Sequence, residues 1–367
     1  MDGGYVTLAQ VASAARVSLA TASRVLNGGA RVVRPELRDR VLAAARRLSY
    51  VPNAHAQALA GGATATVGLV MHDVSDPYFA SITRGAMQVA AEHGVLVVLG
   101  STFRSPEREI EYVSLLRGQR TRAILLVGSG FTDPGYLREM GAELAGYQGS
   151  GGRYAFISHH DLPGAAVLPD NRGGAAEVAR ALVRLGHRRI AVAGGPPRLN
   201  TVEHRVGGFV EALAAAGVPS ADVTVVEREF SEEGGYVAAH DLVTAGLPAT
   251  ALFCASDVMA IGALLALRER GVAVPGRLSL IGFDDIPIAR HLTPALSTVA
   301  LDLEEMGRRA MELVLACPRP GADPDGGDGQ DDGDDRDTGE SGDREPEDSR
   351  VWIPARLVLR DSTGPPP

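Results

Sequence analysis

The sequence predicts an α/β protein in which an N-terminal, all-α helix-turn-helix head precedes a two-lobed, doubly wound α/β body. Two observations support this division. Residues 7–27 read as two short helices, each preceded by a capping residue. From residue 66 onward, short runs rich in β-branched residues alternate with alanine-rich helical segments. That alternation is typical of parallel sheets covered by helices on both faces.

The head begins with two helices that share one small core. Thr7 caps the first helix and Gln10 completes a capping box, while Ser18 caps the second helix. Their apolar positions are Leu8, Val11, Ala12, Val17, Ala22 and Val25. The second helix is left with an outward face of Leu19, Ala20, Thr21, Ser23 and Arg24. A helix of this size enters the DNA major groove; the alternative is an ordinary pair of surface helices. Arg16 occupies the turn, where a positive φ would favour glycine.

A third helix and a short joint complete the head. The segment 35–48 starts with Pro35 in its first turn and carries apolar residues on one face. Residues 50–53 break this helix, and the amphipathic piece 54–60 is too short to be stable alone. We therefore expect a DNA-binding domain at 1–52 and a hinge helix at 53–62 that orders only against another surface.

The body contains eight short apolar runs with the composition of strands. They lie at 67–71, 95–100, 123–127, 154–157, 190–193, 223–226, 251–255 and 278–283. Helical patterns between them lie at 80–93, 172–185, 204–216 and 258–270. This number of βα units fits one barrel or two doubly wound lobes. Breaks around 158–164 and 286–294 favour two lobes with several chain crossings.

We expect the first lobe at 63–165 plus 293–317, and the second at 166–292 plus 350–363. Residues 318–349 carry thirteen acidic residues, three arginines and almost nothing apolar, which predicts a disordered acidic insertion. Because a strand pattern resumes at 351–359, the insertion belongs to a surface loop rather than a tail. It is either a tolerated, solvated loop or a segment that competes with DNA for the arginines of the head.

Charge is unevenly distributed along the chain. The net charge is −9, yet residues 1–62 carry eight arginines and three acidic residues. A basic head of this kind suits contact with phosphates. The chain contains no lysine, which excludes a P-loop lysine and a pyridoxal Schiff base and leaves every cationic side-chain contact to arginine.

No pattern indicates catalysis, a cofactor or a membrane. Cys254 and Cys317 are far apart and lack a metal-ligand spacing. The sequence shows no nucleophile elbow, zinc-binding helix motif or dinucleotide fingerprint. Ser158, His159 and Asp161 are triad residue types, but adjacency in sequence is not triad geometry. Without a signal segment or a membrane-length apolar run, we expect a cytoplasmic protein that is not an enzyme and binds no cofactor or metal.

Several stretches together resemble the LacI/GalR family of bacterial transcriptional repressors. They are the head, the joint at 50–60, and the segments 74–79 (VSDPYF), 167–171 (VLPDN), 185–191 (LGHRRIA), 255–260 (ASDVMA) and 281–285 (IGFDD). The resemblance runs from about residue 6 to 363, interrupted by the acidic insertion. It implies a body of the periplasmic-binding-protein type, a homodimer on a pseudo-palindromic operator, and an effector held between the lobes.

The resemblance also assigns DNA contacts. Arg24 can pair bidentately with guanine, while Leu19 and Ala20 offer only apolar contact, for example to a thymine methyl. Leu59 matches a residue that wedges into a minor-groove step, with plain helix packing as the alternative. The expected DNA-contacting residues are Thr7, Ser18, Leu19, Ala20, Thr21, Ser23, Arg24, Asn27, Asn53, Ala56 and Leu59.

For the effector, Arg205 and Asp257 match pocket positions of the family. A guanidinium and a carboxylate suit the vicinal hydroxyls of a sugar. Asp257 follows the strand at 251–255, where ligands sit in open α/β sheets, although a helix N-cap is an equally good role. The expected effector-contacting residues are Asp76, Tyr78, Phe79, Thr201, Arg205 and Asp257. Asp76 could instead shape a turn, and the two rings could fill core.

The sequence thus predicts a DNA-binding transcriptional repressor that acts as a homodimer and responds to a small effector, expected to be a carbohydrate. One alternative is a regulator that takes a purine or nucleoside as corepressor. A more remote alternative is a sugar-binding transport protein without a role at DNA. Binding of residues 1–62 to a palindromic duplex would discriminate between regulator and transporter.

Overall fold

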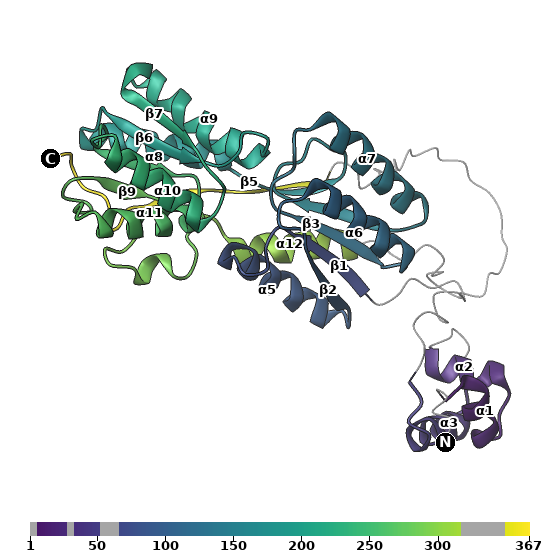
Figure 1. Cartoon of the computed structure of the whole chain (residues 1–367). Coiled ribbons are helices and arrows are strands. Elements are labelled where there is room, and N and C mark those ends of the chain that lie inside the picture. Colours follow the sequence, from purple (N-terminus) through teal and green to yellow (C-terminus); the bar gives the residue numbers. More distant parts are fainter. Residues whose placement is uncertain (1–5, 28–32, 52–65, 317–348) are drawn as a thin grey trace, which may run out of the picture. The chain divides into compact units, whose positions relative to one another are not determined.

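The computed structural model describes residues 6–27, 33–51, 66–316 and 349–367 (Figure 1). The expected hinge helix at 53–62, with Asn53, Ala56 and Leu59, lies outside these residues, as does nearly all of the expected acidic insertion. The chain divides into two compact units, of which the first contains the head and the second nearly all of the body.

The head is the predicted three-helix unit, with α1 at Leu8–Ala15, α2 at Leu19–Asn27 and α3 at Pro35–Arg47. The capping box at Thr7 and Gln10 is confirmed, since each residue's side chain accepts a hydrogen bond from the other's backbone N–H. Arg16 adopts a left-handed conformation with φ 51°, as its place in the turn predicted. The Arg40 guanidinium donates to the Ala15 carbonyl oxygen at 2.5 Å and so caps α1.

A small apolar core joins the three helices of the head. Its fully buried members are Val11, Ala12, Ala15, Ala22, Val41, Ala44 and Ala45. These side chains are small, so the helices approach closely and little apolar area is available to stabilise the unit.

The first lobe of the body is built on a six-stranded parallel sheet in the order β11-β5-β4-β3-β1-β2 (Figure 1). Its strands are β1 Thr66–Met71, β2 Leu96–Ser101, β3 Ala123–Val127, β4 Arg153–Ile157, β5 Ala165–Pro169 and β11 Arg350–Ile353. The helices packed with this sheet are α5 Pro77–Glu92, α6 Pro106–Gly118, α7 Pro134–Gly149 and α12 Leu303–Leu315. Proline stands at the first position of α5, α6 and α7, where its missing N–H costs nothing.

The second lobe is built on a four-stranded parallel sheet in the order β7-β6-β8-β9. Its strands are β6 Ile190–Gly194, β7 Val223–Glu227, β8 Ala251–Cys254 and β9 Ser279–Ile281. The accompanying helices are α8 Asn171–Leu185, α9 Asn200–Ala215, α10 Glu232–Thr244 and α11 Asp257–Glu269. A short antiparallel pair, β10 Thr298–Ala300 with β12 Arg356–Val358, adjoins the crossing segments.

The chain crosses between the lobes at places that the sequence located only roughly. Residues from 166 onward were expected in the second lobe. Strand β5 instead pairs with β4 and belongs to the sheet of the first lobe. Strand β11 also pairs with β5, although residues 350–363 were expected in the second lobe. The strand pattern at 351–359 is in fact two strands, because Pro354 cannot donate to a ladder and separates β11 from β12.

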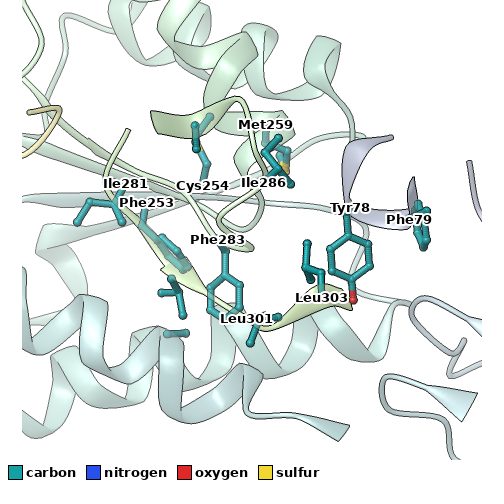
Figure 2. Packing of buried hydrophobic residues seen from close by; sticks show 14 of the residues in the cluster. Tyr78, Phe79, Phe253, Cys254, Met259, Ile281, Phe283, Ile286, Leu301 and Leu303 are labelled. Atoms are coloured by element: carbon teal, nitrogen blue, oxygen red, sulfur yellow. The ribbon is translucent and has the colours of Figure 1, made fainter. Parts of the chain in front are cut away.

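One apolar cluster extends from the first lobe into the second. Figure 2 shows Tyr78 and Phe79 of α5 in the same cluster as Phe253 and Phe283 of the second lobe. The rings of Phe253 and Phe209 lie 4.7 Å apart and anchor the second-lobe part. The two lobes therefore share buried surface next to the cleft described below.

Candidate DNA-reading face and effector cleft

Helix α2 presents the outward face that the sequence predicted. Leu19 is 54% exposed although it is apolar, and Ala20 and Arg24 are exposed beside it. Ala22 on the opposite face is fully buried in the head core. An apolar side chain that stands in solvent next to a guanidinium suits contact with base edges in the major groove.

The remaining predicted DNA contacts differ in how accessible they are. Thr7 and Ser18 are exposed at the starts of α1 and α2, while Thr21 and Ser23 are half-buried. Ser18 Oγ accepts from the backbone N–H of Thr21 at 3.1 Å and lies 2.8 Å from the Thr21 hydroxyl. Asn27 ends α2, and its side chain lies outside the described residues. Arginines at 24, 34, 38, 46 and 47 are also exposed on the head.

The cleft of the body is formed where strands of both sheets end. His72 follows β1, Ser129 follows β3, and Phe230 and Asp284 follow β7 and β9. Ligands bind at the carboxyl ends of parallel strands in folds of this class. The cavity volume is about 30 Å³, so the side chains of its lining nearly fill the cleft. Its lining consists of His72, Asp76, Tyr78, Phe79, Arg104, Gly128, Ser129, Leu199, Thr201, Val202, Arg205, Phe230 and Asp284.

Three predicted effector residues come from the start of α5. Asp76 caps the helix, with its Oδ1 accepting from the Tyr78 N–H at 2.9 Å. The turn role and the cleft position therefore coexist, because the second carboxylate oxygen is not used by the cap. Burial raises the pKa of the Asp76 carboxyl above its usual value. Tyr78 and Phe79 are buried with their rings edge to face, and both line the cavity while also filling core.

The guanidinium of Arg205, on α9, donates three hydrogen bonds to other residues of the protein. Its Nε donates to Asn171 Oδ1 at 2.9 Å, and its Nη1 donates to the Ala255 carbonyl at 2.7 Å. Its Nη2 donates to Asp284 Oδ1 at 2.7 Å. The guanidinium carbon lies 3.8 Å from the centre of the Phe283 ring. Burial raises the pKa of Asp284 to about 7 despite the neighbouring guanidinium.

Asp257, which was also predicted to contact an effector, does not line the cavity. Its side chain is fully buried. Oδ1 accepts from the Thr298 hydroxyl at 2.6 Å and Oδ2 from the Ile286 N–H at 2.9 Å. The helix is instead capped by Ser256, whose Oγ accepts from the Met259 N–H at 3.2 Å. The carboxylate that faces the cavity beside Arg205 is Asp284.

Thr201 connects the two lobes next to the cavity. Its backbone N–H donates to Ser129 Oγ at 2.9 Å, and its hydroxyl lies 3.2 Å from Ser158 Oγ. Asn200 Nδ2 donates to Asp161 Oδ2 at 2.9 Å in the same region. The segment 158–161, which has triad residue types but was given no role from the sequence, thus contributes contacts between the lobes.

Eight residues of the cleft were not predicted from the sequence. They are His72, Arg104, Gly128, Ser129, Leu199, Val202, Phe230 and Asp284. Two of them carried a readable signal, because His72 and Asp284 directly follow predicted strands, where parallel-sheet proteins bind ligands. Arg104 and Phe230 carried none, since each depends on a loop conformation that brings the side chain back to the cleft.

Comparison with known proteins identifies the family. The model of bacterial regulatory proteins of the lacI family matches residues 7–53, and a periplasmic binding protein-like domain matches residues 179–363. The HTH-type transcriptional regulator GalS of Salmonella typhimurium is 36% identical over 313 residues, which cover 84% of this chain and 89% of that protein. The chain belongs to the LacI family of bacterial transcriptional regulators. The prediction of a DNA-binding regulator rather than an enzyme is confirmed.

Solved structures confirm the fold of this LacI-family chain. The transcriptional regulator CelR in complex with cellobiose is 29% identical, has a TM-score of 0.64, and covers 98% of this chain and 100% of its own. The lac repressor dimer bound to operator and an anti-inducer has a TM-score of 0.78 at 23% identity, with the same coverage. Among the described residues of our chain, no helix is long and apolar enough to cross a membrane.

Proposed function

We propose that this LacI-family protein is a cytoplasmic repressor that binds a pseudo-palindromic operator as a homodimer and releases or engages it in response to a small carbohydrate. The observation that carries the proposal is the pairing, in one chain, of an exposed helix α2 with a charge-lined cleft between two lobes. The first feature suits reading DNA, and the second suits binding a polar ligand.

The head supports sequence-specific binding rather than phosphate attraction alone. Arg24 is exposed in the last turn of α2 and can pair with guanine O6 and N7. Leu19 and Ala20 extend this surface with apolar contact. Ser18 and Thr21 hydroxyls beside them suit phosphate oxygens, which position the helix without specifying sequence.

The cleft supports a polyhydroxylated ligand. Asp76 and Asp284 offer acceptors, Arg104 and Arg205 offer donors, and the aromatic walls offer apolar faces for the C–H groups of a sugar ring. A nucleoside could also use the aromatic walls. The transcriptional regulator CelR, whose structure is similar to this chain, forms a complex with cellobiose, which is why we favour a carbohydrate for this chain.

The homodimer is supported by an apolar surface on the first lobe. Strand β2 is the outer strand of its sheet, and its exposed residues are apolar. Leu96 is 66% exposed, and Val98 and Leu99 are exposed beside it. Met87 of the adjacent helix α5 is also exposed. A bare apolar edge favours association. A second copy of the chain would cover it, and the resulting dimer would carry two heads.

The proposal is tested by selecting duplexes from a random library with the full chain and measuring the affinity of the recovered site. A recovered two-fold symmetric site supports a dimeric reader, since symmetry in the protein is matched in the operator. The same titration is repeated with neutral sugars and with adenosine, which distinguishes the carbohydrate from the nucleoside effector. Failure to enrich any symmetric site at modest ionic strength would contradict the proposal.

A further inference from the structure

Two histidines from different lobes meet where the lobes contact each other. His159 follows β4 in the first lobe, and His204 lies on α9 in the second lobe. Their ring centroids are 4.3 Å apart, and the ring planes are inclined at 84°. Both side chains are half-buried. We call His159 and His204 the histidine pair.

Backbone hydrogen bonds next to the histidine pair join the same two lobes. Asn200 N donates to the Gly130 carbonyl at 3.2 Å, and Thr132 N donates to the Arg198 carbonyl at 3.0 Å. Gly130 N in turn donates to the His159 carbonyl at 3.0 Å. The loop that carries His159 is therefore connected to the second lobe through the backbone of Gly130.

The histidine pair is also connected to the effector cleft. Thr201 precedes His204 by three residues on α9, and its N–H donates to Ser129 Oγ at 2.9 Å. Thr201 and Ser129 both line the cavity. A separation of the lobes at the histidine pair therefore opens one edge of the cleft.

The contact between the rings depends on their protonation. His159 Nε2 lies 3.2 Å from the Pro169 carbonyl oxygen. A carbonyl oxygen can only accept, so Nε2 carries the proton of the neutral ring and a second proton adds at Nδ1. Two neutral imidazoles can pack edge to face, whereas two imidazolium rings at this separation repel each other.

The surroundings of the histidine pair favour the neutral rings. Burial, followed by the charge of His204, lowers the pKa of His159, and burial is also the main cause that lowers the pKa of His204. The charged groups that face the pair are Asp161, Asp170, Arg172 and Glu203. The carboxylates act to raise the two pKa values and the guanidinium lowers that of His204, but burial outweighs each of them. Adjacent His160 stacks on the Phe156 ring, and burial lowers its pKa to about 4.

We propose that the histidine pair is a proton-sensitive contact between the two lobes of the effector domain. At pH 7.5 both rings are neutral and the lobes stay in contact beside them. As the pH falls below 6.5, the rings take up protons more readily when they are apart than when they are packed together. Acidification therefore separates the contact and opens the adjacent edge of the cleft, without any effector.

Trp352 provides the first measurement on the full chain. It is the only tryptophan in the sequence, and its ring centroid lies 6.0 Å from that of His159. An imidazolium quenches indole fluorescence more strongly than a neutral imidazole does, so the emission reports protonation of His159. His204→Gln removes the neighbouring charge, and His204→Arg makes it permanent. His291→Gln is the matched control, because His291 is an exposed histidine on η2 (Ala289–His291).

We expect the two His204 variants to shift the fluorescence midpoint in opposite directions between pH 8 and 4.5. The midpoint of His204→Gln should lie at least about half a pH unit above that of wild type, and that of His204→Arg at least about half a unit below it. The reason is that a neighbouring positive charge disfavours a second one. His291→Gln should keep the wild-type midpoint. Circular dichroism over the same range checks that each variant stays folded.

Hydrogen exchange measures whether protonation separates the lobes. The amides to follow are those of Thr132, Asn200 and Thr201, which donate from one lobe to the other, with buried strand β3 as the internal reference. After correction for the intrinsic pH dependence of exchange, these amides of wild type should exchange about three- to tenfold faster at pH 5.5 than at pH 7.5. His204→Gln should lose most of this difference. His204→Arg should exchange at pH 7.5 as fast as wild type does at pH 5.5.

Three results would overturn the inference. An unchanged fluorescence midpoint in both His204 variants would show that the two rings do not interact electrostatically. Equal corrected exchange at both pH values in wild type would show that protonation does not separate the lobes. The full wild-type pH difference in His204→Gln would assign the sensitivity to another group, such as His72. None of these measurements uses operator or sugar, so their outcome is independent of the proposed function.

Discussion

The two functional regions of this protein differ in how far their functional side chains are exposed to solvent. On helix α2 the side chains expected to read DNA stand in solvent, and Leu19 is more than half exposed. In the cleft, Arg205 is 2% exposed and is held by three acceptors of the protein. The difference implies that function and stability are separable in the head but inseparable in the cleft. Substitutions can test this contrast one region at a time.

The largest effect on stability is expected from Arg205→Ala. Removing one partner of a buried ion pair leaves Asp284 uncompensated and typically costs about 3–5 kcal/mol. Arg172→Ala is the surface control, because Arg172 pairs with Glu211 where both side chains are largely exposed, and such pairs contribute about 0–1 kcal/mol. Urea unfolding of the full chain measures both. Equal destabilisation by the two substitutions would show that the cleft network does not support the fold.

A pH-dependent effect is expected from His72 on the cleft wall. Burial is the main cause that lowers the pKa of this imidazole from 6.5 to about 3. Because the pKa is lower in the folded than in the unfolded state, the neutral His72 imidazole contributes its full stability above pH 6.5. This contribution is lost as the pH falls toward 3. Relative to His72→Gln, wild type should lose about 1.4 kcal/mol per pH unit in this window. Unfolding free energies of the two proteins at pH 6, 5 and 4 measure the slope, and parallel curves would be inconsistent with a buried neutral histidine.

The sequence predicted the head in more detail than the cleft, and the reason is the range of the interactions. Caps at Thr7 and Ser18 act over three residues, so a local pattern reveals them. The partner of Arg205 is 79 residues away at Asp284, and no local pattern distinguishes it from Asp257. Both aspartates follow or open elements at the correct sheet edge, and only packing turns Asp257 toward Thr298 and Ile286.

The long range of the interactions also explains which features of the body were not predicted. Strand β5 was not predicted because Ala165 and Ala166 weaken its β-branched signature, and its assignment comes from pairing with β4 and β11. Arg104 could not be predicted as a cleft residue, since two consecutive positive φ values bring it there. Alternation of strands and helices, by contrast, was sufficient to predict the doubly wound architecture.

A smaller effect, confined to DNA recognition, is expected from Arg24→Ala. Loss of a bidentate pair to guanine should cost about 1–3 kcal/mol at one base pair of each half-site and relax discrimination there. The unfolding free energy should change by less than about 0.5 kcal/mol, because the side chain is exposed. Affinities for the selected site and its single-base variants measure this. Uniform weakening on all sequences would assign Arg24 to phosphate contact instead.

The smallest effect is expected from neutralising the acidic stretch within residues 318–349. Replacing residues 319–349 by a glycine–serine segment of the same length removes thirteen acidic residues and three arginines. If this stretch is a tolerated loop, the unfolding free energy should change by less than about 0.5 kcal/mol. The salt dependence of operator binding should also be unchanged, and it is the quantity to measure. Tighter binding at low salt with a steeper slope would instead indicate competition with DNA for the head.

Regulation by this protein requires communication between the cleft and the head. The most direct test is the anisotropy of a labelled, selected operator titrated with the full chain, without sugar and with a saturating neutral saccharide. We predict that the saccharide shifts the operator affinity by about 5–150-fold, which corresponds to a coupling free energy of about 1–3 kcal/mol. An operator affinity that is the same in both titrations would contradict the account.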